Sequence, residues 1–413
     1  MQSFDISKYS QILRVASFRN FFLGFLFSNL GDAMSKVALA WYVWEETQSA
    51  AALGLLTLLS LGPVVIGGFF AGWILDRYDK RLVIMVDSIF RGLAVSLVPI
   101  LFFFGRLEVW HVYVVAALYG FLGMIAWAGG PAIVPTLVKK EQLPTANALE
   151  SFAFMSGNVL GPSLAGLLIS RIGAPNVVAL DALTFFLFAG FLVFVRVPKD
   201  GDDAQSTAVR QESTYRNAFR LLGSNRILSS TTAMYFVTNI GSGLLLVWLP
   251  IYSDLTLQGG AQLYGLLLAA MSAGEVISSF IAGGMNYRVS LGRLIGSALI
   301  VGGIPLALLQ ISTAPLWAAL CLFVHGFLVG PLTIWAQTMR MVIIPPELRG
   351  RVFAMLRTMM VAGFPVGGAL AGALTSAIGI PGLIWLTAGL MTTTGLAGIS
   401  VKQLRNSDDY LEG

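Results

Sequence analysis

The chain has 413 residues, of which 56% are hydrophobic and 11% are charged. Charged residues make up about a quarter of an ordinary soluble domain, so this composition excludes a soluble globular protein. A helix needs about 20 apolar residues to cross a bilayer, and the sequence has room for roughly a dozen such helices. The net charge of +5 does not indicate a nucleic-acid partner, because the distribution of the cations matters more than their sum.

The apolar stretches predict an all-α membrane protein with twelve transmembrane helices in two six-helix repeats. Helices satisfy their own backbone polar groups in lipid. We expect the helices at residues 18–44, 51–75, 82–104, 109–138, 146–169, 176–197, 227–253, 263–285, 291–311, 316–344, 352–378 and 382–401. The predicted domains are an N-terminal segment at 1–17, a six-helix bundle at 18–197, a linker at 198–226, a second bundle at 227–402 and a tail at 403–413.

The basic residues predict how these helices are oriented. With the N-terminus inside the cell, lysines and arginines concentrate in the cytoplasmic segments, and the outer segments hold only Arg106 and Arg171. Cytoplasmic loops of membrane proteins carry such an excess. Both termini and the linker are therefore predicted to be cytoplasmic. Residues 1–17 show no pattern of a cleavable signal peptide, and the single Cys321 permits no intrachain disulfide.

The two predicted halves repeat one another. The segment SNLGD at 28–32 has a counterpart in TNIGS at 238–242. Glycines and prolines also recur in the fifth and eleventh predicted helices, where they form candidate helix-bend positions: Gly157, Gly161, Pro162, Gly166, Gly363 and Pro365. Related halves with Gly/Pro-interrupted helices are typical of secondary transporters, in which one half rocks against the other. Ordinary packing of small residues between helices is the alternative interpretation.

A charged stretch, GWILDRYDKR at 72–81, lies between the second and third predicted helices. It resembles the corresponding loop of the major facilitator superfamily, whose pattern is Gly-x-x-x-Asp-Arg-x-Gly-Arg-(Lys/Arg). The matching residues are Gly72, Asp76, Arg77 and Arg81, with Lys80 as a conservative substitute and Asp79 in place of the second Gly. The resemblance implies a gating loop; a basic loop that only maintains topology is the alternative.

Two acidic–basic pairs in this half have i,i+4 spacing, which favours side-chain pairing on a helix. Asp87 and Arg91 are expected to pair near the cytoplasmic end of the third helix and to join the gating loop. Asp32 and Lys36 share a face of the first helix, so an ion pair between them is one interpretation of Asp32.

Three further stretches resemble the macrolide-efflux and enterobactin-exporter branch of the superfamily. They are FRNFF at 18–22 followed by Gly31-Asp32, PAIVPTLV at 131–138, and PPELRGRV at 345–352. The resemblance implies the major facilitator fold and a drug:H⁺ antiporter type of exporter. Drug antiporters of the superfamily often carry a basic residue in the middle of the fourth helix. Residues 114–120 contain none, which puts a coupling scheme based on that arginine in doubt.

Carboxylates inside the predicted helices are candidates for proton coupling, because charge in a bilayer is costly and marks function. Asp32 near the middle of the first helix and Glu275 in the eighth are the two proposed here; structural pairing or hydrogen bonding is the alternative for both. Asp181 and Glu150 are expected to lie near helix N-termini and to cap them. Arg357 is expected to reach the cytoplasm or to pair locally.

By resemblance, the first, fourth, seventh and tenth helices line a central cavity. The candidate lining residues are Asn29, Trp127, Tyr235, Asn239, His325 and Trp335. Aromatic and amide groups with few fixed charges favour an amphipathic or lipophilic solute. Any membrane helix carries some aromatic residues, which is the competing interpretation. His325 is predicted to be either a hydrogen-bonded packing residue or a group that titrates near neutral pH.

These patterns predict a plasma-membrane secondary transporter that exports an amphipathic or lipophilic small molecule, such as a drug, macrolide or siderophore, by proton antiport. The expected partners are the solute, protons and the lipid bilayer, with the protein a monomer. No phosphate loop, zinc-ligand spacing or hydrolase elbow occurs in the sequence, so no enzyme activity, metal or cofactor is expected. A lipid or glycolipid flippase of the same fold is one alternative. A substrate-gated channel or a non-transporting membrane receptor is an alternative of another class.

Overall fold

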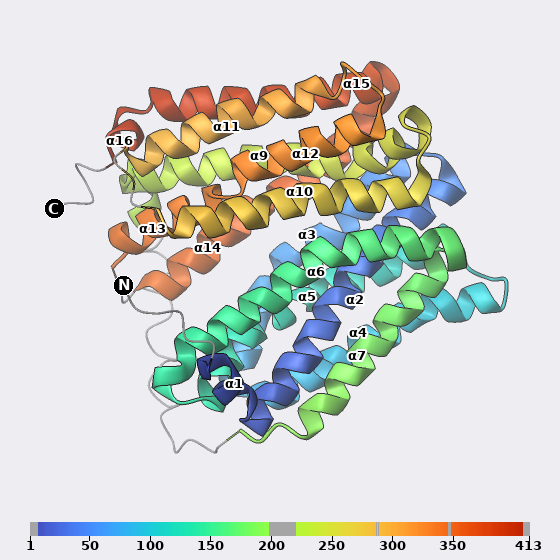
Figure 1. The fold of residues 1–413 in the computed structure, drawn as a ribbon, viewed down its shortest axis with the longest axis vertical. Helices are drawn as coiled ribbons and strands as arrows, with labels where there is room; N and C mark the ends of the chain where they lie inside the picture. Colours follow the sequence, from blue (N-terminus) through green and yellow to red (C-terminus); the bar gives the residue numbers. More distant parts are fainter. Residues whose placement is uncertain (1–6, 198–219, 286, 288, 346–347, 408–413) are drawn as a thin grey trace. The chain divides into compact units, whose positions relative to one another are not determined.

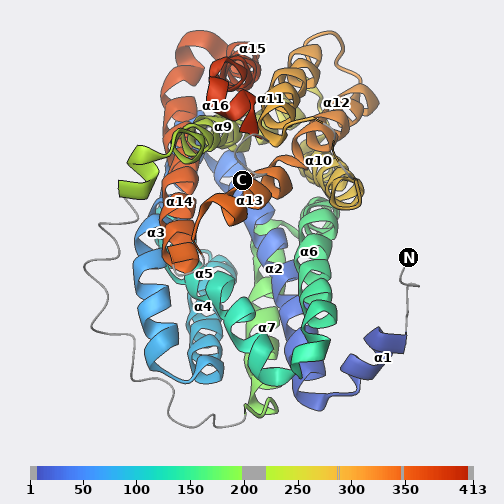
Figure 2. The same ribbon diagram turned by 90° about the vertical axis from the view of Figure 1, so that its left-hand side faces the viewer.

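The computed structural model describes residues 7–197, 220–285, 287, 289–345 and 348–407. The predicted linker, which begins at residue 198, therefore lies mostly outside the described residues. The described part of the chain is helical and divides into two compact units. The first comprises Met1–Glu46 and Gly62–Ala204, and the second comprises Thr47–Leu61 and Gln205–Gly413. Figures 1 and 2 show their helices in two views.

The helices of the N-terminal half confirm the predicted all-α class. A short helix, α1, precedes them within the segment expected to be an N-terminal extension. The elements are α1 (Ser7–Leu13), α2 (Ala16–Thr47), α3 (Ala50–Arg77), α4 (Lys80–Phe103), α5 (Val109–Leu137), η1 (Lys140–Gln142), α6 (Leu143–Ile172) and α7 (Ala174–Val193). In the first unit α4 packs beside α5 and α7, and α6 also packs beside both.

The C-terminal half continues the pattern with helices of similar length. Its elements are α9 (Arg226–Ile251), η4 (Tyr252–Thr256), α10 (Gly260–Gly283), α11 (Leu291–Leu308), α12 (Pro315–Val329), α13 (Leu332–Ile343), α14 (Arg349–Val361), α15 (Gly363–Ser400) and α16 (Lys402–Arg405). Within the second unit α15 packs against α9 and α11, and α10 packs against α12 (Figure 2).

The element α15 is two helices joined by a sharp reversal. Gly367 lies against the Ile240 carbonyl of α9, and Thr387 lies against Gly241, the next residue of the same helix. A straight helix would separate points roughly 20 residues apart by about 30 Å. The chain reverses at Gly379, whose φ of 65° and ψ of −178° are open essentially only to glycine. The boundary predicted between the last two helices falls at this point.

Ten helical stretches in the described part of the chain are long and apolar enough to cross a membrane. The polar middle of α2 keeps it out of this set, although at 32 residues it is long enough to span. The last of the ten stretches, Val352–Ser400, contains the reversal at Gly379 and so supplies two helices. The described elements thus account for the twelve predicted helices.

Two of the predicted helices are interrupted. The tenth was expected to run unbroken over 316–344, but it divides into α12 and α13 at Gly330 and Pro331. The eleventh divides into α14 and α15 at Ala362, just before Gly363 and Pro365. Proline lacks a backbone N–H and clashes with the preceding turn, which accounts for breaks at these positions.

The helices carry large apolar side chains on their outer surfaces. Phe280, Phe103 and Leu316 are each more than four-fifths exposed. Water-soluble monomers rarely expose contiguous apolar surface on this scale, whereas lipid tails solvate it. The exposure therefore agrees with a chain that spans a membrane several times.

Helix α2 lies at the centre of the first unit and is approached closely by glycines. A Cβ on Gly157 or Gly161 of α6 would lie 2.8 Å from the Asn29 carbonyl oxygen and 2.5 Å from the Ala33 Cβ, respectively. A Cβ on Gly31 of α2 would lie 2.5 Å from the Asp181 carboxylate of α7. Glycine lets the backbones approach this closely, as is common between membrane helices.

Helix α9 of the second unit is also approached closely by a glycine. A Cβ on Gly363 would lie 2.2 Å from the Phe236 carbonyl oxygen and 3.0 Å from the Asn239 Cβ. Asn29 and Asn239 hold equivalent places in the sequence repeat, so each faces a glycine of the fifth helix of its own half. The sequence repeat is therefore also a repeat of helix contacts.

Candidate functional site

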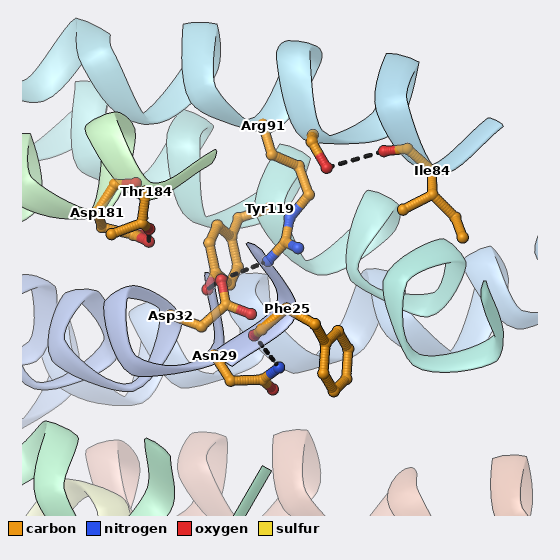
Figure 3. A network of polar contacts seen from close by, with 9 residues as sticks. Phe25, Asn29, Asp32, Ile84, Arg91, Tyr119, Asp181 and Thr184 are labelled. Atoms are coloured by element: carbon orange, nitrogen blue, oxygen red, sulfur yellow. Dashed lines mark hydrogen bonds and ion pairs between the residues drawn. The ribbon is translucent and has the colours of Figure 1, made fainter. Parts of the chain in front are cut away.

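The centre of the first unit holds an ion pair between two helices. Arg91 of α4 donates from Nη2 to Oδ1 of Asp32 in α2 at 2.8 Å. The Arg91 side chain is 3% exposed and the Asp32 side chain 18%. Tyr119 of α5 donates its hydroxyl hydrogen to the same Asp32 oxygen. Figure 3 shows the three side chains converging from three helices.

Aromatic rings enclose the guanidinium group. The Arg91 Cζ lies 4.3 Å from the ring centroids of both Tyr119 and Phe185. The face of an aromatic ring attracts a cation, by about 2 kcal/mol where water is excluded. The rings thus hold Arg91 in place and keep water away from the ion pair.

Two further carboxylates lie within electrostatic range of the same guanidinium. They belong to Asp87 of α4 and Asp181 of α7, and both residues are buried. Thr184 donates to Asp181 Oδ1 at 3.3 Å, but Asp181 Oδ2, Asp87 Oδ1 and Arg91 Nε have no hydrogen-bond partner within the described residues. One buried cation therefore faces three carboxylates. We call Asp32, Asp87, Arg91, Tyr119 and Asp181 the Asp32 cluster.

The predicted pairing of Asp87 with Arg91 is wrong, and so is the alternative interpretation that paired Asp32 with Lys36. Asp87 forms no ion pair with Arg91 within 4.0 Å among the described residues, because the guanidinium is turned across to Asp32 of another helix. Lys36 is exposed on α2 and does not pair with Asp32. Arg91 is predicted from the sequence to join the gating loop. In this structure it belongs to the Asp32 cluster instead.

The capping roles predicted for two carboxylates are also wrong. Asp181 and Glu150 each lie about two turns inside their helices, α7 and α6, rather than in the first turn. Asp181 joins the Asp32 cluster because Gly31 lets α7 approach α2. Sequence reasoning missed Tyr119 altogether, although a tyrosine midway along an apolar helix was visible as a signal.

The loop resembling the family's gating loop is short, since α3 ends at Arg77 and α4 begins at Lys80. Asp79 caps α4 by accepting a hydrogen bond from the Leu82 N–H at 2.9 Å. Arg81 donates to the Leu192 and Val193 carbonyls at the end of α7, at 2.7 and 2.9 Å. Cations at a helix C-terminus satisfy its free carbonyls, so Arg81 ties this loop to α7.

The remaining residues of this loop make fewer described contacts. The Arg77 Cζ lies 5.6 Å from the Trp73 ring centroid, and Lys80 is half-buried. For Gly72 and Asp76 the structure describes the helical backbone alone. The second half has a matching arrangement, in which Ser290 caps α11 and Arg293 donates to the Arg405 carbonyl at 3.0 Å.

Glu275, the second candidate for proton coupling, lies in the second unit on α10. Its side chain is half-buried and forms no hydrogen bond or ion pair with another described residue. A Cβ on Gly330 of α12–α13 would lie 2.5 Å from the Glu275 carbonyl oxygen. Glu275 and Asp32 are therefore brought into different units, and only Asp32 has a cluster of partners.

The candidate cavity residues occupy several environments. Asn29 donates to the Phe25 carbonyl at 2.7 Å (Figure 3), and Asn239 donates to the Met360 carbonyl at 2.8 Å. His325 is buried, with Nδ1 2.7 Å from the Gly302 carbonyl oxygen.

The remaining cavity candidates are aromatic. Tyr235 and Trp335 share one apolar cluster of the second unit. The side chain of Trp127 lies outside what the structure describes.

A family model described as transmembrane secretion effector matches residues 7–411. Among curated proteins, the chain is similar to the multidrug efflux pump Tap of Mycolicibacterium fortuitum, with 24% identity over 93% of this chain and 95% of Tap. It is also similar to macrolide efflux protein A of Streptococcus pyogenes, with 24% identity over 92% and 95% of the two chains. The enterobactin exporter EntS of Salmonella typhi is 25% identical over 87% of this chain and 85% of its own.

Solved transporter structures share the fold at low sequence identity. The nucleoside transporter NupG has a TM-score of 0.71 with 12% identity, covering 93% of this chain and 98% of its own. The D-xylose-proton symporter has a TM-score of 0.69 with 14% identity, covering 94% and 96%. These matches agree with the observed pair of six-helix halves.

Proposed function

We propose that this chain, which belongs to the transmembrane secretion effector family of major facilitator transporters, exports an amphipathic or lipophilic small molecule by proton antiport. The observation that carries the proposal is the Asp32 cluster. Its excess of negative charge is held inside membrane helices, where isolated charges are costly. Proton uptake by one of its carboxylates relieves that excess.

The geometry suggests how a proton is coupled to movement. When Asp32 is ionised, its attraction for Arg91 joins α2 to α4. When Asp32 takes up a proton, Arg91 keeps its charge and is drawn toward Asp87 and Asp181. The guanidinium then moves between partners on different helices, which gives α2 two preferred positions, one for each protonation state.

The relatives support the direction and class of transport. They include a multidrug efflux pump, a macrolide efflux protein and an enterobactin exporter. We therefore assign export of a solute of macrolide or siderophore type. A transport assay with each class of solute identifies the individual solute.

Location and assembly follow from the same proposal. We propose that both termini are cytoplasmic, because the segments on that side carry most of the basic residues. A monomer in the plasma membrane is part of the same proposal. The loop around Asp76 and Arg77 is proposed to act as a gate, and the glycine contacts at Gly157 and Gly363 are proposed to let helices bend during the cycle. Glu275 is retained as a second candidate proton site.

The proposal is tested with purified protein in liposomes whose interior is more acidic than the outside. Uptake of a labelled macrolide, and separately of enterobactin, should follow the pH gradient and should acidify the outer medium as protons leave. Asp32→Asn should lose at least about tenfold of gradient-driven uptake, a change of about 1.4 kcal/mol in the coupled step. It should retain exchange of labelled for unlabelled solute, because exchange needs no proton movement.

The matched control is Lys36→Gln, which removes an exposed charge one turn along the same helix and should leave both activities intact. Uptake that ignores the gradient, or full gradient-driven uptake by Asp32→Asn, would contradict the coupling scheme. Movement of labelled lipid in the absence of solute transport would instead identify a flippase.

A further inference from the structure

The second unit contains a buried arginine for which the described residues supply no counter-ion. Arg340 of α13 is 4% exposed. No carboxylate lies within 4.0 Å of its guanidinium among the described residues. Nη2 donates to the Met360 Sδ at 3.2 Å, and Cζ lies 5.1 Å from the centroid of the Tyr235 ring. A thioether is a weak acceptor, so this hydrogen bond compensates the buried guanidinium only weakly.

Further polar groups nearby are equally unsatisfied. Arg340 Nε, the Tyr235 hydroxyl and Trp335 Nε1 are all buried without a hydrogen-bond partner in the described part of the chain. The Thr238 hydroxyl, one turn from Tyr235 on α9, has none either. Arginine and the indole are donors only, and the two hydroxyls also donate. We call Arg340, Tyr235, Trp335 and Thr238 the donor cluster.

The donor cluster lies well inside the helices. Tyr235 follows the start of α9 at Arg226 by nine residues, which is about 13 Å of helix. Met360, which contacts Arg340, lies a comparable distance along α14 from Arg349. Side chains lean toward the N-terminus of their helix, so Arg340 reaches from the last turn of α13 back toward its middle. Three helices therefore bring these groups to the interior of the second unit.

Such a cluster is expensive as a purely structural element. A buried donor that lacks an acceptor destabilises the fold, and a buried charge that lacks a partner destabilises it more. Several unsatisfied donors around one cation therefore call for a group that is both negatively charged and rich in acceptor oxygens. A carboxylate or phosphate fits the guanidinium with two parallel hydrogen bonds.

We infer that the donor cluster binds the acidic group of the transported solute, and that the solute therefore includes an aromatic or apolar acid. The inference rests on the proposed function, because it names the solute class for that transport. The acidic group would lie against Arg340 and accept from the Tyr235 hydroxyl. The rings of Trp335 and Tyr287, whose centroids are 5.7 Å apart in an edge-to-face arrangement, would contact the apolar part.

The same chemistry is offered by the headgroup of an anionic lipid, so the test separates the two sources. The full-length protein, purified in a neutral detergent, is heated with 1-naphthoate or with 1-naphthamide, its uncharged counterpart. We expect naphthoate to raise the unfolding temperature and naphthamide to raise it less. In nanodiscs of phosphatidylcholine, the naphthoate effect should persist, and replacing part of the lipid with phosphatidylglycerol should not abolish it.

Two variants locate the effect. Arg340→Gln should remove the difference between naphthoate and naphthamide, whereas Arg226→Gln, which removes an exposed charge at the start of α9, should leave it intact. If Arg340→Gln does not fold, Tyr235→Phe provides the test and should weaken naphthoate binding roughly threefold to tenfold, as the loss of one hydrogen bond does.

Three results would overturn the inference. They are equal stabilisation by the acid and the amide, a naphthoate effect that survives Arg340→Gln, and stabilisation by phosphatidylglycerol alone that depends on Arg340. The binding test needs no pH gradient, so its failure is distinct from failure of proton coupling. A protein that binds naphthoate through Arg340 but ignores a pH gradient would retain this site and lose the antiport mechanism.

Discussion

Arg91 Nη2 lies 2.8 Å from Asp32 Oδ1, although the two residues are 59 positions apart in the sequence. Asp87 is one helical turn from Arg91 and forms no ion pair with it among the described residues. Packing between helices therefore pairs Arg91 with Asp32 rather than with Asp87 on its own helix. The aromatic rings of Tyr119 and Phe185 hold the guanidinium on the α2 side.

This ion pair predicts strong coupling between its two members. Arg91→Gln should destabilise the protein by about 3 kcal/mol, because it leaves a buried carboxylate without its cation. The double variant Asp32→Asn/Arg91→Gln should be less destabilised than the sum of the single variants, by about 1–3 kcal/mol. Thermal unfolding of the four proteins in detergent measures the difference. Additive effects would mean that the pair contributes little, and Lys36→Gln should change nothing.

The glycine contact on α9 predicts a steric penalty. In Gly363→Ala the new Cβ would lie 2.2 Å from the Phe236 carbonyl oxygen, which is backbone and moves only with its helix. We expect a loss of about 1–3 kcal/mol, as in other overpacked sites. Gly389→Ala on α15 is the matched control, since its Cβ would have nothing within 4 Å. The yield of folded protein and its unfolding temperature report both, and equal behaviour would show that the contact is loose.

The contact between Arg81 and the end of α7 predicts that replacing Arg81 destabilises the junction between α7 and the loop that joins α3 to α4. Arg81→Gln removes two hydrogen bonds to the last carbonyls of α7, and we expect a cost of about 1–2 kcal/mol because the site is partly exposed. Lys80→Gln, which alters the neighbouring charge, should cost less. Hydrogen exchange at the amides of residues 190–195 should rise in the Arg81 variant alone; unchanged protection would show that the contact is dispensable.

The burial of His325 predicts that it takes no part in proton coupling. Its Nδ1 lies 2.7 Å from the Gly302 carbonyl oxygen, and its side chain is buried in α12. His325→Gln keeps a donor to that carbonyl and should leave the ratio of uptake rates at about pH 6 and about pH 8 unchanged, since that range brackets an ordinary histidine. Rates are compared after normalising to folded protein. A flattened pH profile would make His325 a coupling residue.

The fold was predictable from the sequence because its determinants are local. Long apolar runs fix the helices, and the repeated glycines of the fifth and eleventh helices specify contacts that recur at Asn29 and Asn239. The break at Ala362 lies next to two bend positions proposed from the sequence, Gly363 and Pro365. The break at Pro331 was not expected, since proline in a membrane helix is often tolerated and the surrounding packing decides whether the helix is interrupted.

The site was predictable only in part. Asp32 stood out as a charge midway along an apolar helix, which is rare enough to be informative. Its partner, Arg91, did not stand out. Spacing along single helices paired Arg91 with Asp87, and Asp32 with Lys36. Asp181 joins the cluster through the close approach at Gly31, and that proximity depends on how α2 and α7 pack, which no single helix encodes.

Helix α3 has a consequence for how the protein is assembled. Its first part lies within the segment Thr47–Leu61, which is grouped with the second unit, where a Cβ on Gly54 would lie 2.6 Å from the Gly368 carbonyl oxygen. The rest of α3 belongs to the first unit, and Pro63 lies directly after the division. During synthesis, the N-terminal half therefore emerges with a segment whose packing partners have not yet been made.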